Sequence, residues 1–215
     1  MTDDKRHAGD LRLIGGRLCL DFANTVGWRT RDHPSERLAS YTDLVAWGQQ
    51  VGIVEEHEAH RLLEEAGRRP AVASAVLERA LVLREAIYRV FSAVAGERTP
   101  QAADIATLNG FLSQAMSRLH LALTAEGFAW RWAGDGDSLE RILWPVAQSA
   151  AELLTSDELD RVGICAGDGC GWLFFDASKN RSRRWCAMDD CGNRAKARRH
   201  YRQSRILKQS EAQKG

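Results

Sequence analysis

Apolar residues recur every three or four positions through most of the chain before residue 155, which is the spacing of amphipathic helices. The longest pattern follows Pro70, a residue that suits the first turn of a helix, and stops at Gly96. Thr42 is a plausible N-cap for an earlier helix, and Ser138 for a later one. The spacing predicts helices over residues 41–50, 57–69, 71–95, 100–116 and 139–154.

Two stretches change to a period of two, which is typical of strands. Residues 11–26 form two short alternating runs around a glycine pair and predict a hairpin, with residues 18–22 as a half-buried strand. Residues 119–123 and 128–132 alternate in the same way and predict a second hairpin. The polar segment 27–40 predicts a loop.

Composition and charge limit the classes of protein to which the chain can belong. A chain of 215 residues with 44% apolar and 27% charged residues can form one medium domain and one small one. The polar N-terminus shows no secretory signal and no window approaches the ~20 apolar residues of a membrane span, so we expect a cytoplasmic protein with no membrane partner. Residues 161–215 carry 13 Lys/Arg and 5 Asp/Glu, a balance of +8, which leaves −7 for residues 1–160. This asymmetry predicts an anionic partner for the C-terminal end.

Four cysteines organise that basic end. Four residues separate Cys165 from Cys170, four separate Cys186 from Cys191, and fifteen lie between the pairs. Paired cysteines in a reducing compartment are typical of zinc sites, in which each pair supplies one edge of a tetrahedron. We therefore predict one structural Zn²⁺ per chain with these four ligands; a disulfide pair or an iron–sulfur cluster is the alternative.

Aromatic and basic residues surround the cysteines. Residues 171–175 predict a short strand, and Asp176 or Ser178 is placed to cap a short helical turn that runs to Trp185. After Cys191 a basic helix is expected, because Arg194, Arg198, Arg202, Arg205 and Lys208 recur at spacings of three and four and form one stripe. The predicted nucleic-acid contacts are Lys179, Asn180, Arg181, Arg183, Arg184, Asn193, Arg194, Lys196, Arg198, Arg199, Arg202, Arg205 and Lys208.

The N-terminal part contains no phosphate loop, nucleophile elbow or helical zinc-protease motif, so we do not expect an enzyme. Asp21, Asn24 and Arg29 follow the first predicted hairpin and are candidates for a small-molecule pocket, although hydrogen bonding of a turn is the simpler interpretation. His57 and His60 are more simply part of a solvated helix than metal ligands.

The tetrapeptide Cys191-Gly192-Asn193-Arg194 resembles the CGNR zinc finger, which is named for it. In that family the finger follows a helical ABATE domain, and residues 15–25 resemble the start of that domain. The resemblance implies a bacterial stress-induced transcription regulator, with a zinc-dependent DNA-binding finger and an N-terminal domain that senses a signal or ligand. Its finger match takes in Cys165, Cys170, residues 172–175, Asp176, residues 178–180, residues 183–186 and residues 198–201.

Together these features predict an α+β fold that is mainly α. Residues 1–158 would form a helical sensor domain with short β-hairpins, and residues 159–210 a small zinc finger that ends in a basic helix. The expected function is zinc-dependent regulation of transcription through duplex DNA, with a small-molecule effector and a homodimer as further possibilities. The alternatives are an RNA- or ribosome-associated zinc module, and a small-molecule hydrolase in the N-terminal domain.

Overall fold

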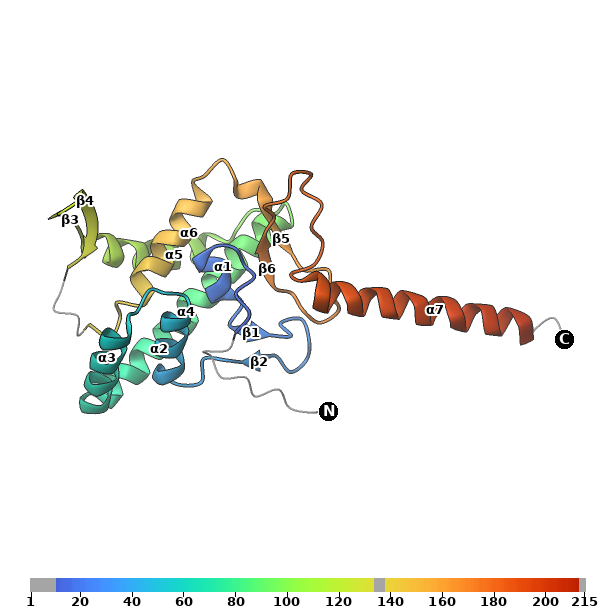
Figure 1. Cartoon of the computed structure of the whole chain (residues 1–215), viewed down its shortest axis with the longest axis horizontal. Coiled ribbons are helices and arrows are strands. Elements are labelled where there is room, and N and C mark those ends of the chain that lie inside the picture. Colours follow the sequence, from blue (N-terminus) through green and yellow to red (C-terminus); the bar gives the residue numbers. More distant parts are fainter. Residues whose placement is uncertain (1–10, 134–137, 213–215) are drawn as a thin grey trace.

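Helices form most of the structure and lie close to the predicted positions (Figure 1). The computed structural model describes residues 11–133 and 138–212, and the side chains of the last helix as far as Arg205. Helices predominate and the strands form only two-stranded sheets, so the predicted mainly helical α+β class is confirmed. The longer helices of the N-terminal part are α2 Tyr41–Gln50, α3 Glu56–Arg68, α4 Pro70–Ala95, α5 Ala102–Met116 and α6 Leu143–Leu154.

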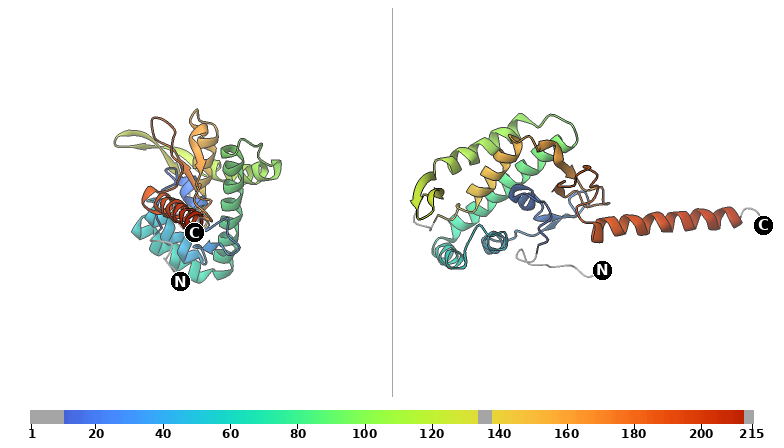
Figure 2. Two further views of the ribbon diagram at one scale, coloured as in Figure 1. Left: turned by 90° about the vertical axis from the view of Figure 1, so that its right-hand side faces the viewer. Right: turned by 45° about the horizontal axis from the view of Figure 1, so that its top comes forward.

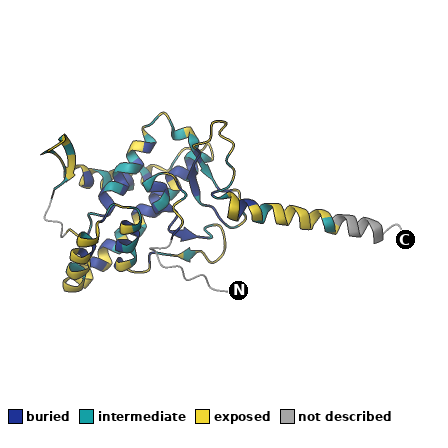
Figure 3. Ribbon diagram, in the orientation of Figure 1, coloured by how far each residue is buried: buried dark blue, intermediate teal, exposed yellow. Residues whose placement is uncertain are grey.

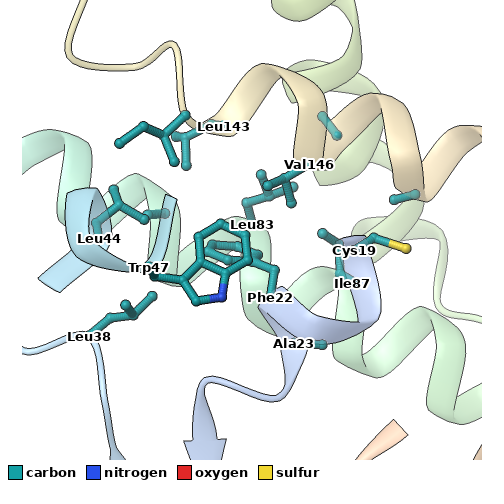
Figure 4. Packing of buried hydrophobic residues seen from close by; sticks show 14 of the residues in the cluster. Cys19, Phe22, Ala23, Leu38, Leu44, Trp47, Leu83, Ile87, Leu143 and Val146 are labelled. Atoms are coloured by element: carbon teal, nitrogen blue, oxygen red, sulfur yellow. The ribbon is translucent and has the colours of Figure 1, made fainter. Parts of the chain in front are cut away.

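Helix α4 is the element on which the others pack. Pro70 occupies its first turn, where a missing N–H costs nothing, and Gly96 caps its end. Its buried face includes Leu83, Ile87 and Phe91. In Figure 4 the side chains of Leu83 and Ile87 lie among those of α1, α2 and α6, with the indole of Trp47 at the centre. This cluster is the main hydrophobic core.

Two helix starts differ from the prediction for local chemical reasons. The N-cap of α2 is Ser40 rather than Thr42, because the Ser40 hydroxyl accepts from the Asp43 N–H while the Asp43 carboxylate accepts from the Ser40 N–H. Helix α6 begins at Leu143 rather than at residue 139. Pro145 follows two positions later, and a proline is tolerated in the first turn of a helix but not in its interior.

The predicted first hairpin is wrong. Residues Leu18–Ala23 form a short helix, α1, instead of a strand. Its N–H groups at Leu20 and Asp21 both bond to the Arg17 carbonyl, and Gly15 packs so closely that a Cβ there would lie 2.7 Å from the Asp21 nitrogen. Most of α1 is buried, and a short element that is apolar on nearly every side has no diagnostic period. Its glycine pair therefore serves a helix start rather than a hairpin turn.

Short antiparallel pairs complete the N-terminal part. The segment predicted as a loop contains β1 Val26–Gly27 paired with β2 Ser35–Glu36. The second predicted hairpin is confirmed as β3 Leu119–Thr124 and β4 Gly127–Trp132, which stand at one end of the molecule (Figure 1). Residues 134–137, whose glycines and aspartates also predict a loop, lie outside the described residues.

The C-terminal part begins with a helical turn, η2 Leu159–Arg161, and the antiparallel pair β5 Val162–Ile164 and β6 Leu173–Phe175. The helical turn predicted to run to Trp185 is absent, because the Asp176 carboxylate instead accepts from the N–H groups of Ser178 and Arg183 and holds an irregular loop. A π-helical turn, η3 Met188–Gly192, leads into α7 Asn193–Ala212. The right-hand view of Figure 2 shows α7 projecting away from the body.

The C-terminal strands share the core of the helical part. Val162, Leu173 and Phe175 belong to the main cluster, while Phe174 faces the other way, among the four cysteines. Figure 3 shows this contrast: buried residues run from the helices into β6, whereas the described part of α7 is mostly exposed. None of the described helices combines the length and the apolar run that a membrane span requires.

Candidate metal centre and basic surface

The four paired cysteines converge on one buried point. Their sulfurs all lie within 4.8 Å of one another, and all four side chains are buried. The Sγ atoms of Cys170 and Cys186 are 3.7 Å apart, and those of Cys186 and Cys191 are 3.6 Å apart. These are free thiols, far beyond the ~2.05 Å of a disulfide bond.

The first pair is held by a tight backbone knuckle after β5. The Cys165 N–H donates to the Trp172 carbonyl at 2.8 Å, and the Cys170 N–H donates to the Gly167 carbonyl at 3.0 Å. A Cβ at Gly167 would lie 2.8 Å from the Cys191 sulfur, so only glycine fits at this position. Because Gly167 has no side chain, the knuckle can bring the first cysteine pair against the second.

The second pair is held by the π-helical turn η3. Cys186 precedes this turn, and Cys191 lies inside it at the point where the backbone becomes α-helical. The Gly192 N–H donates to the Ala187 carbonyl at 3.1 Å, which closes the turn around Cys191. The position of the sulfur and the start of α7 are consequently set by the same few residues.

The donor set fits a tetrahedral zinc ion. Four Zn–S bonds of about 2.3 Å would separate neighbouring sulfurs by about 3.8 Å, close to the observed 3.6 and 3.7 Å. Two N–H donors also point at sulfur: Arg194 Nη2 lies 3.0 Å from Cys191 Sγ, and the Gly167 N–H lies 3.4 Å from Cys165 Sγ. Such donors stabilise thiolates, which are the form that binds metal.

Hydrogen bonds among the thiols shift their pKa values in opposite directions. Hydrogen bonds from Cys170 and Cys186 lower the pKa of Cys165 to about 2. The same bonds raise the pKa of Cys170 to about 12 and also raise that of Cys186. The Cys165 thiolate is thus stabilised by hydrogen bonds from the protonated thiols of Cys170 and Cys186. A divalent cation at the centre would take the place of those protons.

Two predicted nucleic-acid contacts are engaged inside the protein. Arg183 donates to the carbonyls of Phe175 at 2.9 Å, Ile14 at 3.0 Å and Trp185 at 3.1 Å. Its guanidinium also lies 4.6 Å from the centre of the Phe174 ring. Arg194 is partly buried, where it contacts the Cys191 sulfur, the Asp190 carboxylate and the Trp28 ring. Both arginines therefore hold the finger together.

The remaining predicted contacts whose side chains are described lie on the surface. Arg181 pairs with Asp160 and Arg198 with Asp168, and the Asn193 amide donates to the Asp189 carbonyl. The side chain of Lys208, in the last turns of α7, lies outside the described part. The exposed members are Lys179, Asn180, Arg181, Arg184, Asn193, Lys196, Arg198, Arg199, Arg202 and Arg205.

A notch of about 270 Å³ separates the first cysteine knuckle from the start of α7. Its walls are residues 166–168 on one side and four arginines of α7 on the other, with Cys191 at its base. The four arginines are Arg194, Arg198, Arg199 and Arg202. The four arginines make this hollow a candidate site for an oxyanion such as a phosphate, and the Asp168 carboxylate on its wall already pairs with Arg198.

The three residues predicted to line an N-terminal pocket instead make structural bonds. The Asp21 carboxylate accepts from the Gly15 N–H at 2.8 Å, and burial raises its pKa to about 6. The Asn24 amide pairs with both backbone groups of Leu173, at 2.8 and 2.9 Å. Arg29 bonds to the Ala23 carbonyl and to Glu85. Asp21 and the Arg29 side chain thus bond to backbone groups nearby in the sequence, whereas Asn24 bonds to β6 in the C-terminal part.

The helical part is joined to the finger by contacts that sequence reasoning missed. The Trp172 indole donates to the Val26 carbonyl at 2.7 Å, the Arg29 N–H donates to the Cys170 carbonyl at 3.1 Å, and the Tyr88 hydroxyl donates to the Gly171 carbonyl at 3.0 Å. Trp28 adopts a left-handed φ of 56° next to this junction. Backbone acceptors carry no sequence signature, so no pattern could have revealed these bonds.

Among the described residues, the four paired cysteines are the one group of side chains close enough to hold a metal ion together. His57 instead lies 3.2 Å from Glu55, and His60 Nδ1 is bonded to the Glu56 carbonyl. Cys19 is isolated in the main core, where burial raises its pKa to about 12. The four candidate metal ligands are thus separate from His57, His60 and Cys19.

Comparison with protein families found two matches along the chain. The ABATE family model, described as "putative stress-induced transcription regulator", matches residues 16–157. The model of the CGNR zinc finger matches residues 161–204. Comparison with curated proteins found no match.

Proposed function

The chain belongs to the ABATE family and carries a CGNR zinc finger, and we propose that it regulates transcription by zinc-dependent binding of duplex DNA through α7. The observation that carries the proposal is the junction at Cys191. A single turn, η3, holds a candidate zinc ligand and also starts the exposed basic helix. Metal binding and presentation of the helix would therefore be coupled.

Zinc would act as a structural ion, one per chain, held by the four paired cysteines. A bound Zn²⁺ supplies a fixed tetrahedral cross-link, and four sulfur ligands leave no open position for a substrate. The protein supplies the rest: the knuckle at Gly167 sets the approach of the two pairs, and Arg194 offsets thiolate charge at Cys191. In small zinc peptides such an ion contributes on the order of 10–16 kcal/mol to folding.

The shape and charge of α7 suit a duplex. A B-DNA major groove is about 12 Å wide and admits one helix. Helix α7 extends beyond the body without a covering element, and its exposed side chains include Lys196, Arg199, Arg202 and Arg205. Like charges along an isolated helix repel one another, and a phosphate backbone relieves that repulsion. The helix would accordingly be more stable on DNA than free.

The contacts of the tryptophans favour duplex DNA over single-stranded RNA. Stacking on splayed bases requires an accessible aromatic face. Trp172 is partly buried and its indole N–H is bonded to the Val26 carbonyl, while Trp185 packs against the cysteine cluster with the Arg184 guanidinium 5.3 Å from its ring centre. An RNA- or ribosome-associated module therefore stays the second candidate, supported only by the basic surface.

For the helical part we propose the role of receiving a signal, with the division from the finger near residue 158 and a cytoplasmic location. The support is the junction in which segment 24–31 bonds directly to the finger, at Leu173, Trp172 and Cys170. A change in that segment would be transmitted to the metal knuckle without an intervening linker. The hydrolase alternative has less support, because Asp21, Asn24 and Arg29, the candidates for a small-molecule pocket, are all bonded within the fold.

Fluorescence anisotropy with labelled duplex DNA tests the proposal. Zinc-loaded and chelator-treated protein would be titrated at several salt concentrations, with structured RNA as competitor. We expect binding only with zinc, and a slope of log K against log salt of about −4 to −5 for about five phosphate contacts. Absence of affinity for any duplex from a random pool, once one zinc per chain is measured, would show that the proposal is wrong.

A further inference from the structure

The hairpin β3–β4 presents a bare apolar face at the end of the molecule away from α7 (Figure 1). Leu121 is 60% exposed, Leu123 77%, Phe128 80% and Trp130 63%, which places them among the most exposed large apolar side chains of the described residues. Single exposed apolar residues need no explanation, but four on one small element do.

The register of the hairpin places these side chains on one face. Leu121 pairs with Trp130, and Leu123 pairs with Phe128. Alternate residues of a strand point the same way, so the four side chains project together, in line with the pair Leu119 and Trp132. None of the six positions carries a charge, whereas the opposite face includes a histidine and an arginine.

Only the inner end of this face is used within the chain. The Trp132 ring packs against that of Trp144, with centroids 5.8 Å apart, and the Ala133 N–H donates to the Arg118 carbonyl. The outer end extends past the helices with its apolar side uncovered in the described part of the chain. An isolated two-stranded hairpin is marginally stable in water, so such an element usually needs a surface to pack on.

We propose that this surface is the same face of a second copy of the chain, so that two hairpins pack face to face in a homodimer. The face is uncharged and therefore needs an apolar partner, and a twofold axis supplies one automatically because the same patch meets itself. Exposed fractions of 60–80% on two leucines and two aromatic residues correspond to about 500 Å² per copy. The pair would bury about 1,000 Å², the lower limit for a specific interface.

An interface of that size is weak and depends on concentration. We expect a dissociation constant on the order of 10 µM. The proposal is independent of the proposed DNA binding, because the hairpin and α7 lie at opposite ends of the chain (Figure 1). The two surfaces can therefore be altered separately, and failure of one leaves the other to be tested.

Sedimentation velocity of the zinc-loaded full chain from about 1 to 100 µM tests the proposal. We expect the mass to rise from one chain toward two across that range. The double variant L123S/F128S should stay largely monomeric throughout, a loss of at least about 100-fold in affinity, with unchanged zinc content and circular dichroism. Both side chains are mostly exposed, so their replacement should not unfold the chain.

The matched control is Val82→Ser, which replaces another apolar side chain, 53% exposed, on α4 and outside the hairpin. It should dimerise like the unaltered chain. The proposal is overturned if the unaltered chain is monomeric at 100 µM, if L123S/F128S dimerises equally well, or if Val82→Ser weakens the dimer to the same degree. A monomer that binds lipid vesicles or another protein through this face would also overturn it.

Discussion

Arginines next to the metal centre have different roles according to what surrounds them. Arg183 donates to backbone carbonyls inside the finger, Arg194 donates to a cysteine sulfur, and Arg202 faces solvent. All three lie in one basic region and look alike in sequence. The difference arises because buried carbonyls and thiolates near the first two require donors, whereas nothing of this kind surrounds the third.

Replacing Cys191 by serine should remove zinc and DNA binding together. A hydroxyl is a poor zinc ligand, and the same turn starts α7. Zinc per chain and anisotropy with labelled duplex measure the two effects. Cys19→Ala is the control, since Cys19 lies in the separate main core and should keep both properties. One zinc per chain retained in Cys191→Ser would exclude the four-cysteine ligand set.

Asp21→Asn should stabilise the protein at neutral pH. Burial raises the pKa of Asp21 from 3.8 to about 6, so the folded state binds more protons than the unfolded state between those values. The contribution of this group to stability therefore falls as pH rises from about 4 to 6. We expect a gain of about 1–2 kcal/mol at pH 7 that disappears near pH 4. Urea unfolding measures the free energy of unfolding of both proteins across this pH range. The four cysteines are common to both proteins, so their difference reports on Asp21 alone. A difference that does not change with pH would contradict the prediction.

Among the elements, η3 and the first turns of α7 are held next to the cysteine cluster, whereas the described remainder of α7 extends away from the body. The helix follows directly after Cys191, and its second turn carries the ion pair of Arg198 with Asp168 in the knuckle. Beyond that turn, the described residues show no hydrogen bond or ion pair between α7 and the body, and isolated helices of this length are marginal in water. Its outer arginines are consequently free to meet a ligand.

Arg202→Ala should weaken DNA binding without releasing zinc. Arg202 is exposed and lines the notch beside the knuckle. Loss of one phosphate contact should flatten the log–log salt slope by about one unit. Arg61→Ala, which removes an exposed arginine of α3, should leave the slope unchanged. Equal slopes for the unaltered chain and both variants would show that Arg202 makes no phosphate contact.

Asp168→Asn should strengthen DNA binding. The Asp168 carboxylate pairs with Arg198 at the edge of the notch, so it competes with a phosphate for that guanidinium. Both groups are exposed, and an exposed pair contributes about 0–1 kcal/mol, which sets the gain at no more than about fivefold. Anisotropy at low salt measures it. A loss of affinity would indicate that the Asp168 carboxylate positions Arg198 for DNA binding instead of competing with the phosphate.

At the scale of the whole molecule, the finger and the helical part share one core. Strand β6 contributes Leu173 and Phe175 to the main cluster, and Arg17 covers the Phe175 ring. Backbone bonds also cross the junction, such as the Phe175 N–H to the Gly15 carbonyl at 2.7 Å. A finger built in this way moves with the body, so we expect chelation of zinc to destabilise the whole chain.

Asn24→Ala should destabilise the protein by about 2–4 kcal/mol. The amide of Asn24 is the partner of both the N–H and the C=O of Leu173, and its loss leaves two buried backbone groups unpaired. Urea unfolding of the zinc-loaded protein measures the change. Asn180→Ala, at an exposed position of the finger loop, should change the free energy of unfolding by less than about 0.5 kcal/mol. Similar values for the two variants would contradict the role of Asn24.

Period and spacing correctly predicted the elements that are decided locally. The long helices have one apolar stripe, the β3–β4 hairpin has a clean alternation, and the cysteine pairs have ligand spacing. The helix α1 was predicted as a strand, because a short segment buried on nearly every side carries no period. The helical turn before Trp185 was also wrong, since Asp176 satisfies loop N–H groups instead of capping a helix.

Residue type at short spacing is enough to predict the helical class, the four-cysteine cluster and the basic character of the last helix. Folding alone decides which cations are exposed, and that Asn24 and the Arg29 backbone bond across the junction to Leu173 and Cys170. The physical reason is that their partners are backbone groups. Every residue carries such groups, and only folding determines which of them lie buried and in need of a hydrogen bond.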